Sequence, residues 1–147
     1  MVIEDLEVKH GVYFITARPG ATAKRQTDAW LVRHLPYPSF GERPTVLISS
    51  AKGTLARGLK LDAYIDDNLD NVRDVLMESQ DTHVYLLNRR YNQAAEATVT
   101  ASVPVANEIH VVVEGRPCSV ASYGFQTRIA SRVDTLGQFL DLELPRL

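Results

Sequence analysis

The chain has 147 residues, with 16 Lys+Arg against 18 Asp+Glu for a formal net charge of −2, and 45% of its residues are apolar. These proportions are those of a globular domain and exclude a disordered chain, while the lack of a run of about 18 apolar residues excludes a membrane-spanning helix. The charges form no basic stripe, so we expect no binding of nucleic acid. The first segment is too acidic for a signal peptide and Cys118 is the lone cysteine, so we expect a cytoplasmic protein.

Apolar runs alternate with helical patterns over residues 11–92. Four runs rich in β-branched and aromatic residues predict buried strands at 11–16, 45–50, 63–66 and 83–88. Apolar residues at helical spacing predict helices at 23–35, where Trp30 fits the core stripe, and at 52–59 and 70–79. Strands that alternate with helices form right-handed crossovers, so the sequence predicts one α/β domain over 1–147: a three-layer, Rossmann-like parallel sheet with helices on both faces.

The pattern changes after the fourth predicted strand. Residues 93–128 read as an insertion or hairpin, in which 109–114 and 119–123 are the strands and 94–105 is a loop or a poor strand. Apolar residues from Val133 to Leu140 recur at helical spacing, so residues 129–147 predict a closing amphipathic helix that ends at Pro145.

Two adjacent carboxylates, Asp66 and Asp67, follow the third predicted strand. Ligands of parallel α/β sheets bind beyond the carboxyl ends of the strands, and a hard cation such as Mg²⁺ relieves the repulsion between paired acids. Because successive strand residues point to opposite faces, we expect one acid to face the metal and the other to orient loop amides or Lys52. The alternative is a helix N-cap, which Asp67, Asn68 and Asp70 all favour.

Thr16, Arg18 and Lys52 follow the first two predicted strands and suit a phosphate group. A hydroxyl beside backbone N–H groups can hold phosphate oxygens, an arginine fork can grip a second anionic group, and a lysine can neutralise a transferring phosphoryl group. The alternatives are a turn with a surface arginine and a solvated lysine.

Together these segments resemble the haloacid dehalogenase-like (HAD-like) phosphohydrolases, especially the 5′(3′)-deoxyribonucleotidase-like members. The matching motifs are Phe-Ile-Thr-Ala-Arg-Pro at 14–19, Lys52 followed by Ala-Tyr-Ile-Asp-Asp-Asn at 63–68, Val-Tyr-Leu-Leu-Asn at 84–88 with Tyr91-Asn92, and Arg-Val-Asp-Thr-Leu at 132–136. The resemblance implies that Thr16 binds phosphoryl oxygens, that Lys52 stabilises their charge, and that Asp66 and Asp67 help to bind Mg²⁺.

Catalysis in that family begins with a nucleophilic aspartate in an apolar-Asp-x-Asp signature, on a strand that precedes the strand of Thr16. The sequence shows no such signature before residue 11, so it resembles the family core without that strand. We expect such a chain to recruit a strand from a second copy, from a second polypeptide, or from its own hairpin at 108–123. Two functions stay open: a metal-dependent phosphatase of nucleotides or other small phosphomonoesters, incomplete or degenerate by itself, and a non-catalytic phosphate-binding, regulatory or assembly protein.

Overall fold

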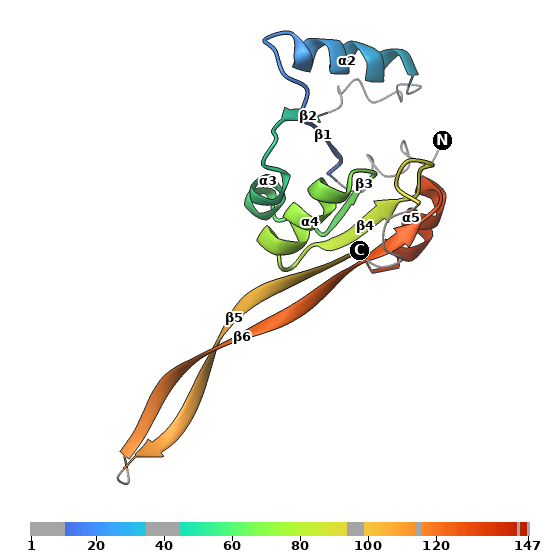
Figure 1. The fold of residues 1–147 in the computed structure, drawn as a ribbon. Coiled ribbons are helices and arrows are strands. Elements are labelled where there is room, and N and C mark those ends of the chain that lie inside the picture. The colour runs from blue at the N-terminus through green and yellow to red at the C-terminus, as the bar shows by residue number, and fades with distance from the viewer. Residues whose placement is uncertain (1–10, 35–44, 94–98, 114–115, 144, 147) are drawn as a thin grey trace. The chain divides into compact units, whose positions relative to one another are not determined.

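The computed structural model describes residues 11–34, 45–93, 99–113, 116–143 and 145–146. It is an α/β protein with a parallel sheet and a mixed sheet, and the chain divides into two compact units, Met1–Lys52 and Gly53–Leu147 (Figure 1). None of the helices within these described ranges is long and apolar enough to cross a membrane.

The first unit holds a two-stranded parallel sheet of β1 (Tyr13–Thr16) and β2 (Thr45–Ile48), with α2 (Ala23–His34) in contact with β2. Leu31 and Val46 supply its buried apolar side chains, together with Ala23. Trp30 was expected in this core stripe, but it is 56% exposed and stacks on His34 with ring centroids 4.5 Å apart, so that expectation is wrong.

The second unit contains the remaining helices and a four-stranded mixed sheet. In chain order the elements are α3 (Lys52–Leu59), β3 (Ala63–Asp66), α4 (Leu69–Glu78), β4 (His83–Leu87), β5 (Val99–Val113), β6 (Arg116–Val133) and α5 (Leu136–Glu143). The strand order is β3-β4-β6-β5, in which β3, β4 and β6 are parallel and β5 is antiparallel to β6. The expected parallel βα pattern is therefore present as far as β4, and an antiparallel strand closes the sheet.

Helix α4 packs on one face of this sheet. Its side chains Val72, Val75 and Leu76 are fully buried, and burial of this kind stabilises the fold by roughly 1.5–3 kcal/mol for each large apolar side chain. Asn68 caps its N-terminus by accepting hydrogen bonds from two amides of the first turn. At its other end, Arg128 of β6 donates to three carbonyl oxygens, those of Leu76 (2.5 Å), Ser79 (2.7 Å) and Thr82 (2.6 Å).

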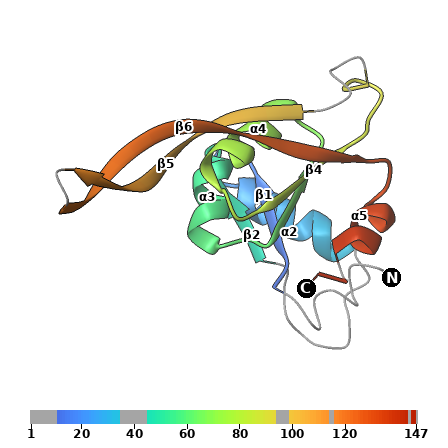
Figure 2. The same cartoon turned by 90° about the horizontal axis from the view of Figure 1, so that it is seen from below.

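Helix α5 lies on the opposite face (Figure 2). Tyr85 of β4 meets Phe139 of α5 edge to face at 5.1 Å, whereas Val84 and Leu86 alternate to the other side of the strand and are buried. Helices therefore flank both faces of the sheet in the second unit.

The β5–β6 hairpin is much longer than the sequence predicted. It pairs from Val99↔Ala130 to Val113↔Arg116, so of the two alternatives for 94–105 the strand is confirmed over residues 99–105, and residues 94–98 lie outside the described residues. The closing helix is present as α5, but its expected start at 129 is wrong because β6 runs to Val133. The alternation of buried Val99, Ala101 and Val103 with exposed residues is period two, but small side chains and a proline obscure it in the sequence. Figure 1 shows β5 and β6 extending beyond α4.

The hairpin also does not supply a neighbour to β3. Strand β6 joins β4 through Ser131–Val133, on the side of β4 away from β3, and residues 108–113 pair with residues of β6 itself. The expectation that residues 108–123 fill a gap beside the Asp66 strand is therefore wrong. Within the ranges that the structure describes, β1 pairs with β2 alone and β3 pairs with β4 alone.

Candidate functional site

Thr16 and Lys52 lie where the sequence predicted them, at the carboxyl end of β1 and at the start of α3. The Thr16 carbonyl accepts a hydrogen bond from the Ser49 amide at 2.9 Å, so the ends of β1 and β2 are tied together. The Thr16 hydroxyl oxygen faces the Arg18 amide at 3.4 Å, and Arg18 itself is exposed. Lys52 is only 6% exposed, so the alternative of a solvated surface lysine is wrong.

Asp66 ends β3 and its carboxylate is held from three sides. One oxygen accepts from the Asn68 amide at 2.8 Å, and the other accepts from the Tyr64 hydroxyl at 2.6 Å and from the Asn71 side chain at 3.1 Å. Burial, and next the charge of Asp66, raise the pKa of Tyr64 well above its ordinary value, so this tyrosine stays a neutral donor. Asp66 therefore orients the loop amide, which is the role that the sequence predicted for one member of the acid pair.

Asp67 occupies the loop between β3 and α4, next to the loop that follows β4. Its Oδ2 accepts a hydrogen bond from the Tyr91 hydroxyl, and that bond raises the pKa of Tyr91 above its ordinary value. Its backbone carbonyl accepts from the Asn92 amide group at 2.8 Å. Within the described part of the chain, Oδ1 of Asp67 takes no hydrogen bond, so Asp67 has an oxygen left for a cation.

Asn92 is the residue that fixes these two loops to each other. It is 3% exposed, donates to the carbonyls of Asp67 and Leu87 (2.9 Å), and accepts from the Arg89 amide at 2.9 Å. The sequence motif Tyr91-Asn92 was noted for its resemblance, but its positioning role was not predicted. The signal that the sequence offers is an asparagine shortly after a predicted strand end.

The end of β6 adds charged side chains to the same edge. Arg132 donates to the Asn88 side chain at 2.6 Å, and Asn88 donates to Asp134 at 2.7 Å. We did not predict Arg132 or Asp134 as site residues, because Val133 fitted a helical pattern. Since β6 is a parallel strand that ends at Val133, Asp134 lies at a strand end on the same carboxyl edge as Asp66 and Asn88.

Asp66 and Asp67 offer few ligands for a metal, and a site with few protein ligands is compatible with Mg²⁺. The described residues contain no group of three or more His, Cys, Asp or Glu side chains that could hold a metal. Mg²⁺ nevertheless keeps several waters and is usually bound by one or two carboxylates together with substrate phosphate. The alternative N-cap role belongs to Asn68, so neither Asp66 nor Asp67 is used as the cap of α4.

The structure thus assembles two partial sets of predicted residues. Thr16, Arg18 and Lys52 lie in the first unit, and Asp66 and Asp67 lie in the second. Their convergence at one rim stays a prediction, and the segment before residue 11 lies outside the described residues. Comparison with family models, curated proteins and solved structures finds no match to this chain.

Proposed function

We propose that this chain is a HAD-like protein of the phosphohydrolase type, which binds Mg²⁺ at Asp67 and a small phosphomonoester such as a nucleotide at Thr16, Arg18 and Lys52. The observation that carries the proposal is the acid pair at the carboxyl end of a parallel strand, with one carboxylate committed to the loop and the other keeping an oxygen for a cation. A bound Mg²⁺ would neutralise phosphate charge there. The three-layer fold of that family and a cytoplasmic location belong to the same proposal.

Each residue has its own role in the proposed site. Thr16 offers a hydroxyl and the Arg18 guanidinium offers a planar fork, both suited to phosphoryl oxygens. Lys52, nearly buried at the N-terminus of α3, would add a positive charge that water screens little. Asp66 would keep the loop amides in place around the metal through its bond to Asn68.

Binding without turnover is the second candidate, and one observation favours it. Among the strands that the structure describes, none ends in Asp-x-Asp, so these residues offer no aspartate nucleophile in the position that the resemblance requires. Phosphoryl transfer from an ester to water would then need a nucleophile from elsewhere. Because β1 and β3 each leave one edge unpaired among the described strands, a strand from a second copy or a second polypeptide would pair there.

Calorimetric titration of the full chain with MgCl₂ tests the metal site. We expect Asp67→Asn to weaken Mg²⁺ binding by about ten- to a hundredfold, as loss of a ligand or its support does, and Asp66→Asn to weaken it less. Asp141→Asn is the matched control, because Asp141 is an exposed acid on α5 in the same unit. Equal affinity in wild type and Asp67→Asn would refute the metal site.

Hydrolysis of an aryl phosphate with Mg²⁺ then separates the two candidates. Turnover that Asp66→Asn abolishes supports the phosphatase. Phosphate binding without turnover, weakened in Thr16→Val, supports the binding protein. Failure of phosphate to bind wild type at all would overturn both.

A further inference from the structure

A second acid cluster lies at the opposite, amino-terminal end of β4. Glu143, the last residue of α5, is 1% exposed. Its carboxylate accepts hydrogen bonds from Nδ1 of His83 at 3.1 Å, from Arg146 at 3.3 Å and from the Tyr85 hydroxyl. Its two oxygens are therefore occupied by three donors, two of which are cationic or can become so.

The surroundings of Glu143 favour its ionised form. Burial alone would raise the pKa of Glu143, but the hydrogen bonds from Tyr85 and His83 and the charges of His83 and Arg146 outweigh it and lower the pKa. Burial, and next the bond to Glu143, raise the pKa of Tyr85 to about 12. The cluster is thus a buried carboxylate with its donors fixed around it.

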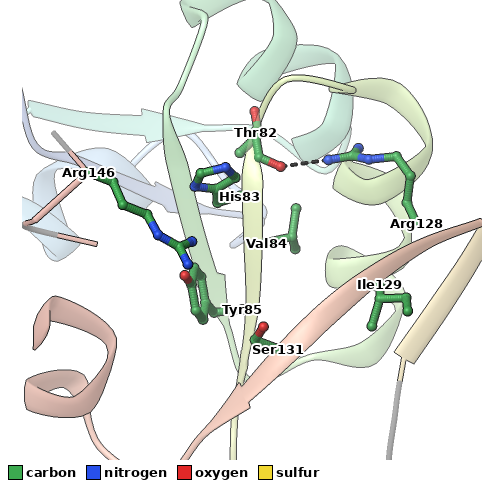
Figure 3. Close-up of a pocket in the computed structure, with 8 residues that line it drawn as sticks. All are labelled: Thr82, His83, Val84, Tyr85, Arg128, Ile129, Ser131 and Arg146. Atoms are coloured by element: carbon green, nitrogen blue, oxygen red, sulfur yellow. Dashed lines mark hydrogen bonds between the residues drawn. The ribbon is translucent and has the colours of Figure 1, made fainter. Parts of the chain in front are cut away.

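A cavity of about 120 Å³ opens beside this cluster, where β4 and β6 diverge. The two strands pair only over Tyr85–Leu87 and Ser131–Val133, so the start of β4 and the preceding part of β6 enclose a wedge. The lining residues are Thr82, His83, Val84, Tyr85, Arg128, Ile129, Ser131 and Arg146 (Figure 3). This volume accommodates several waters, at about 30 Å³ each in the liquid, or one tetrahedral oxyanion.

The lining is rich in donors, and the Glu143 carboxylate beside it already accepts hydrogen bonds from His83 and Arg146. Arg146 has five N–H donors, of which the structure assigns one to Glu143, and its side chain is 56% exposed. His83 has a second ring nitrogen and is 53% exposed, and Ser131 adds a hydroxyl. Figure 3 shows His83, Tyr85 and Arg146 on one side of β4 and Arg128 on the other.

Arg128 adds positive charge, which the charge of Asp81 offsets in part. Its guanidinium contacts three backbone carbonyls, and desolvation lowers its pKa. A small anion in the wedge would feel the charge of Arg128 from one wall and could accept hydrogen bonds from Arg146 at the other. Cationic groups in a partly enclosed site attract anions more strongly than the same groups in open solvent.

We propose that the wedge between β4 and β6 binds one small oxyanion of phosphate size, held by Arg146, His83 and Ser131. Glu143 acts as a positioning residue, because it fixes Arg146 and His83 beside the cavity without facing the ligand as a free acid. This site is independent of the proposed function, since it lies at the opposite end of the strands from Asp66 and Asp67.

Titration of the full, isotope-labelled chain with inorganic phosphate at constant ionic strength, followed by amide NMR, tests this proposal. We expect saturable shifts at Val84, Ile129 and Ser131, and binding about tenfold weaker in Arg146→Gln, because a charge-assisted hydrogen bond is lost. Arg57→Gln is the matched control: Arg57 also pairs with a glutamate, Glu78 at 3.0 Å, and is 61% exposed. It should bind phosphate as wild type does.

Ser131→Ala is the second variant, because its small change in an exposed strand position is not expected to affect folding; binding should weaken about threefold. Linear, non-saturating shifts would mean that the wedge holds water alone and would overturn the proposal. So would equal weakening in Arg57→Gln and Arg146→Gln. Shifts at Thr16 and Asp67 without shifts at Val84 and Ile129 would refute the wedge site while leaving the proposed function intact.

Discussion

The two ends of the parallel strands β3, β4 and β6 hold their acids in opposite ways. At the carboxyl end, Asp67 accepts a hydrogen bond from the neutral Tyr91 hydroxyl, and Asp66 accepts from a tyrosine hydroxyl, an asparagine side chain and a backbone amide besides a further interaction. At the amino end, Glu143 is held by Arg146 and His83 as well as by a tyrosine. Neutral donors orient a carboxylate but leave its charge in place, whereas cationic donors cancel it. The first arrangement suits a bound cation, and the second leaves donors for an anion.

The largest effect on stability should come from the acid at the amino end. We expect Glu143→Gln to lower the free energy of unfolding by about 3 kcal/mol, because bonds to a charged, buried group are worth roughly 1.5–3 kcal/mol each and are not additive. Urea unfolding measures this. Glu78→Gln is the control, since Glu78 forms an exposed pair with Arg57 and should lose less than about 1 kcal/mol.

Wild type and Glu143→Gln should also differ in how their stability depends on pH. Since folding lowers the pKa of Glu143 below its ordinary value of 4.5, its contribution is present above that pH and is lost as the pH falls through the lower, folded value. The difference in stability between wild type and Glu143→Gln should therefore shrink as the pH falls through the acid range. A difference that grew in acid would contradict an ionised Glu143.

Particular residues show how far the sequence could predict this structure. The strands and the helices as far as β4 were predictable because short runs of β-branched and aromatic residues alternate with helical spacing, and the bounds differ by at most two residues or so. Glu143 was not predictable, because its partners His83 and Tyr85 lie 60 and 58 positions away and a buried charge leaves no periodic signal. The full β5–β6 hairpin was missed because the exposed positions at the start of β5 carry Thr100, Ser102 and Pro104 rather than apolar side chains.

In the candidate site, too, some residues could be predicted from the sequence and others could not. Thr16 and Asp66 were found because each ends a recognisable strand, and Lys52 because it begins the helix that follows β2. Asn92 and Arg132 were not, because their roles depend on which loops and strands become neighbours. Strand order is set by packing between distant segments, and β6 takes its place beside β4 through a parallel pairing that local periodicity does not encode.

Asn92 tests whether the carboxyl end depends on its neutral donors for its geometry. We expect Asn92→Ala to lower the free energy of unfolding by about 2 kcal/mol, because it removes three hydrogen bonds from a buried position. Mg²⁺ affinity should fall with it, since the Asp67 carbonyl loses its anchor to Asn92. Gln93→Ala, at an exposed neighbouring position, should change neither quantity. Unchanged Mg²⁺ affinity in Asn92→Ala would show that Asp67 does not need this anchor.

A smaller effect is the stabilisation of the fold by a bound ligand, which should differ between variants of the two ends. A ligand at ten times its dissociation constant stabilises the native state by about 1.4 kcal/mol. We expect Mg²⁺ to protect Arg146→Gln but not Asp67→Asn, and phosphate to protect Asp67→Asn more than Arg146→Gln in the absence of metal. Thermal unfolding with each ligand measures this. Loss of both kinds of protection in either variant would mean that the two ends are not independent.

The smallest effect should follow from removing the Tyr91 hydroxyl. Tyr91 is 71% exposed, so Tyr91→Phe should change the free energy of unfolding by less than about 0.5 kcal/mol. Its hydroxyl occupies only one oxygen of Asp67, and Oδ1 keeps its capacity for a cation. We therefore expect Mg²⁺ affinity to change by less than about threefold, because a hydrogen bond in water contributes little net energy. A tenfold loss in calorimetry would mean that neutral donors do more than orient Asp67, and the contrast between the two ends would then lie in rigidity rather than in charge.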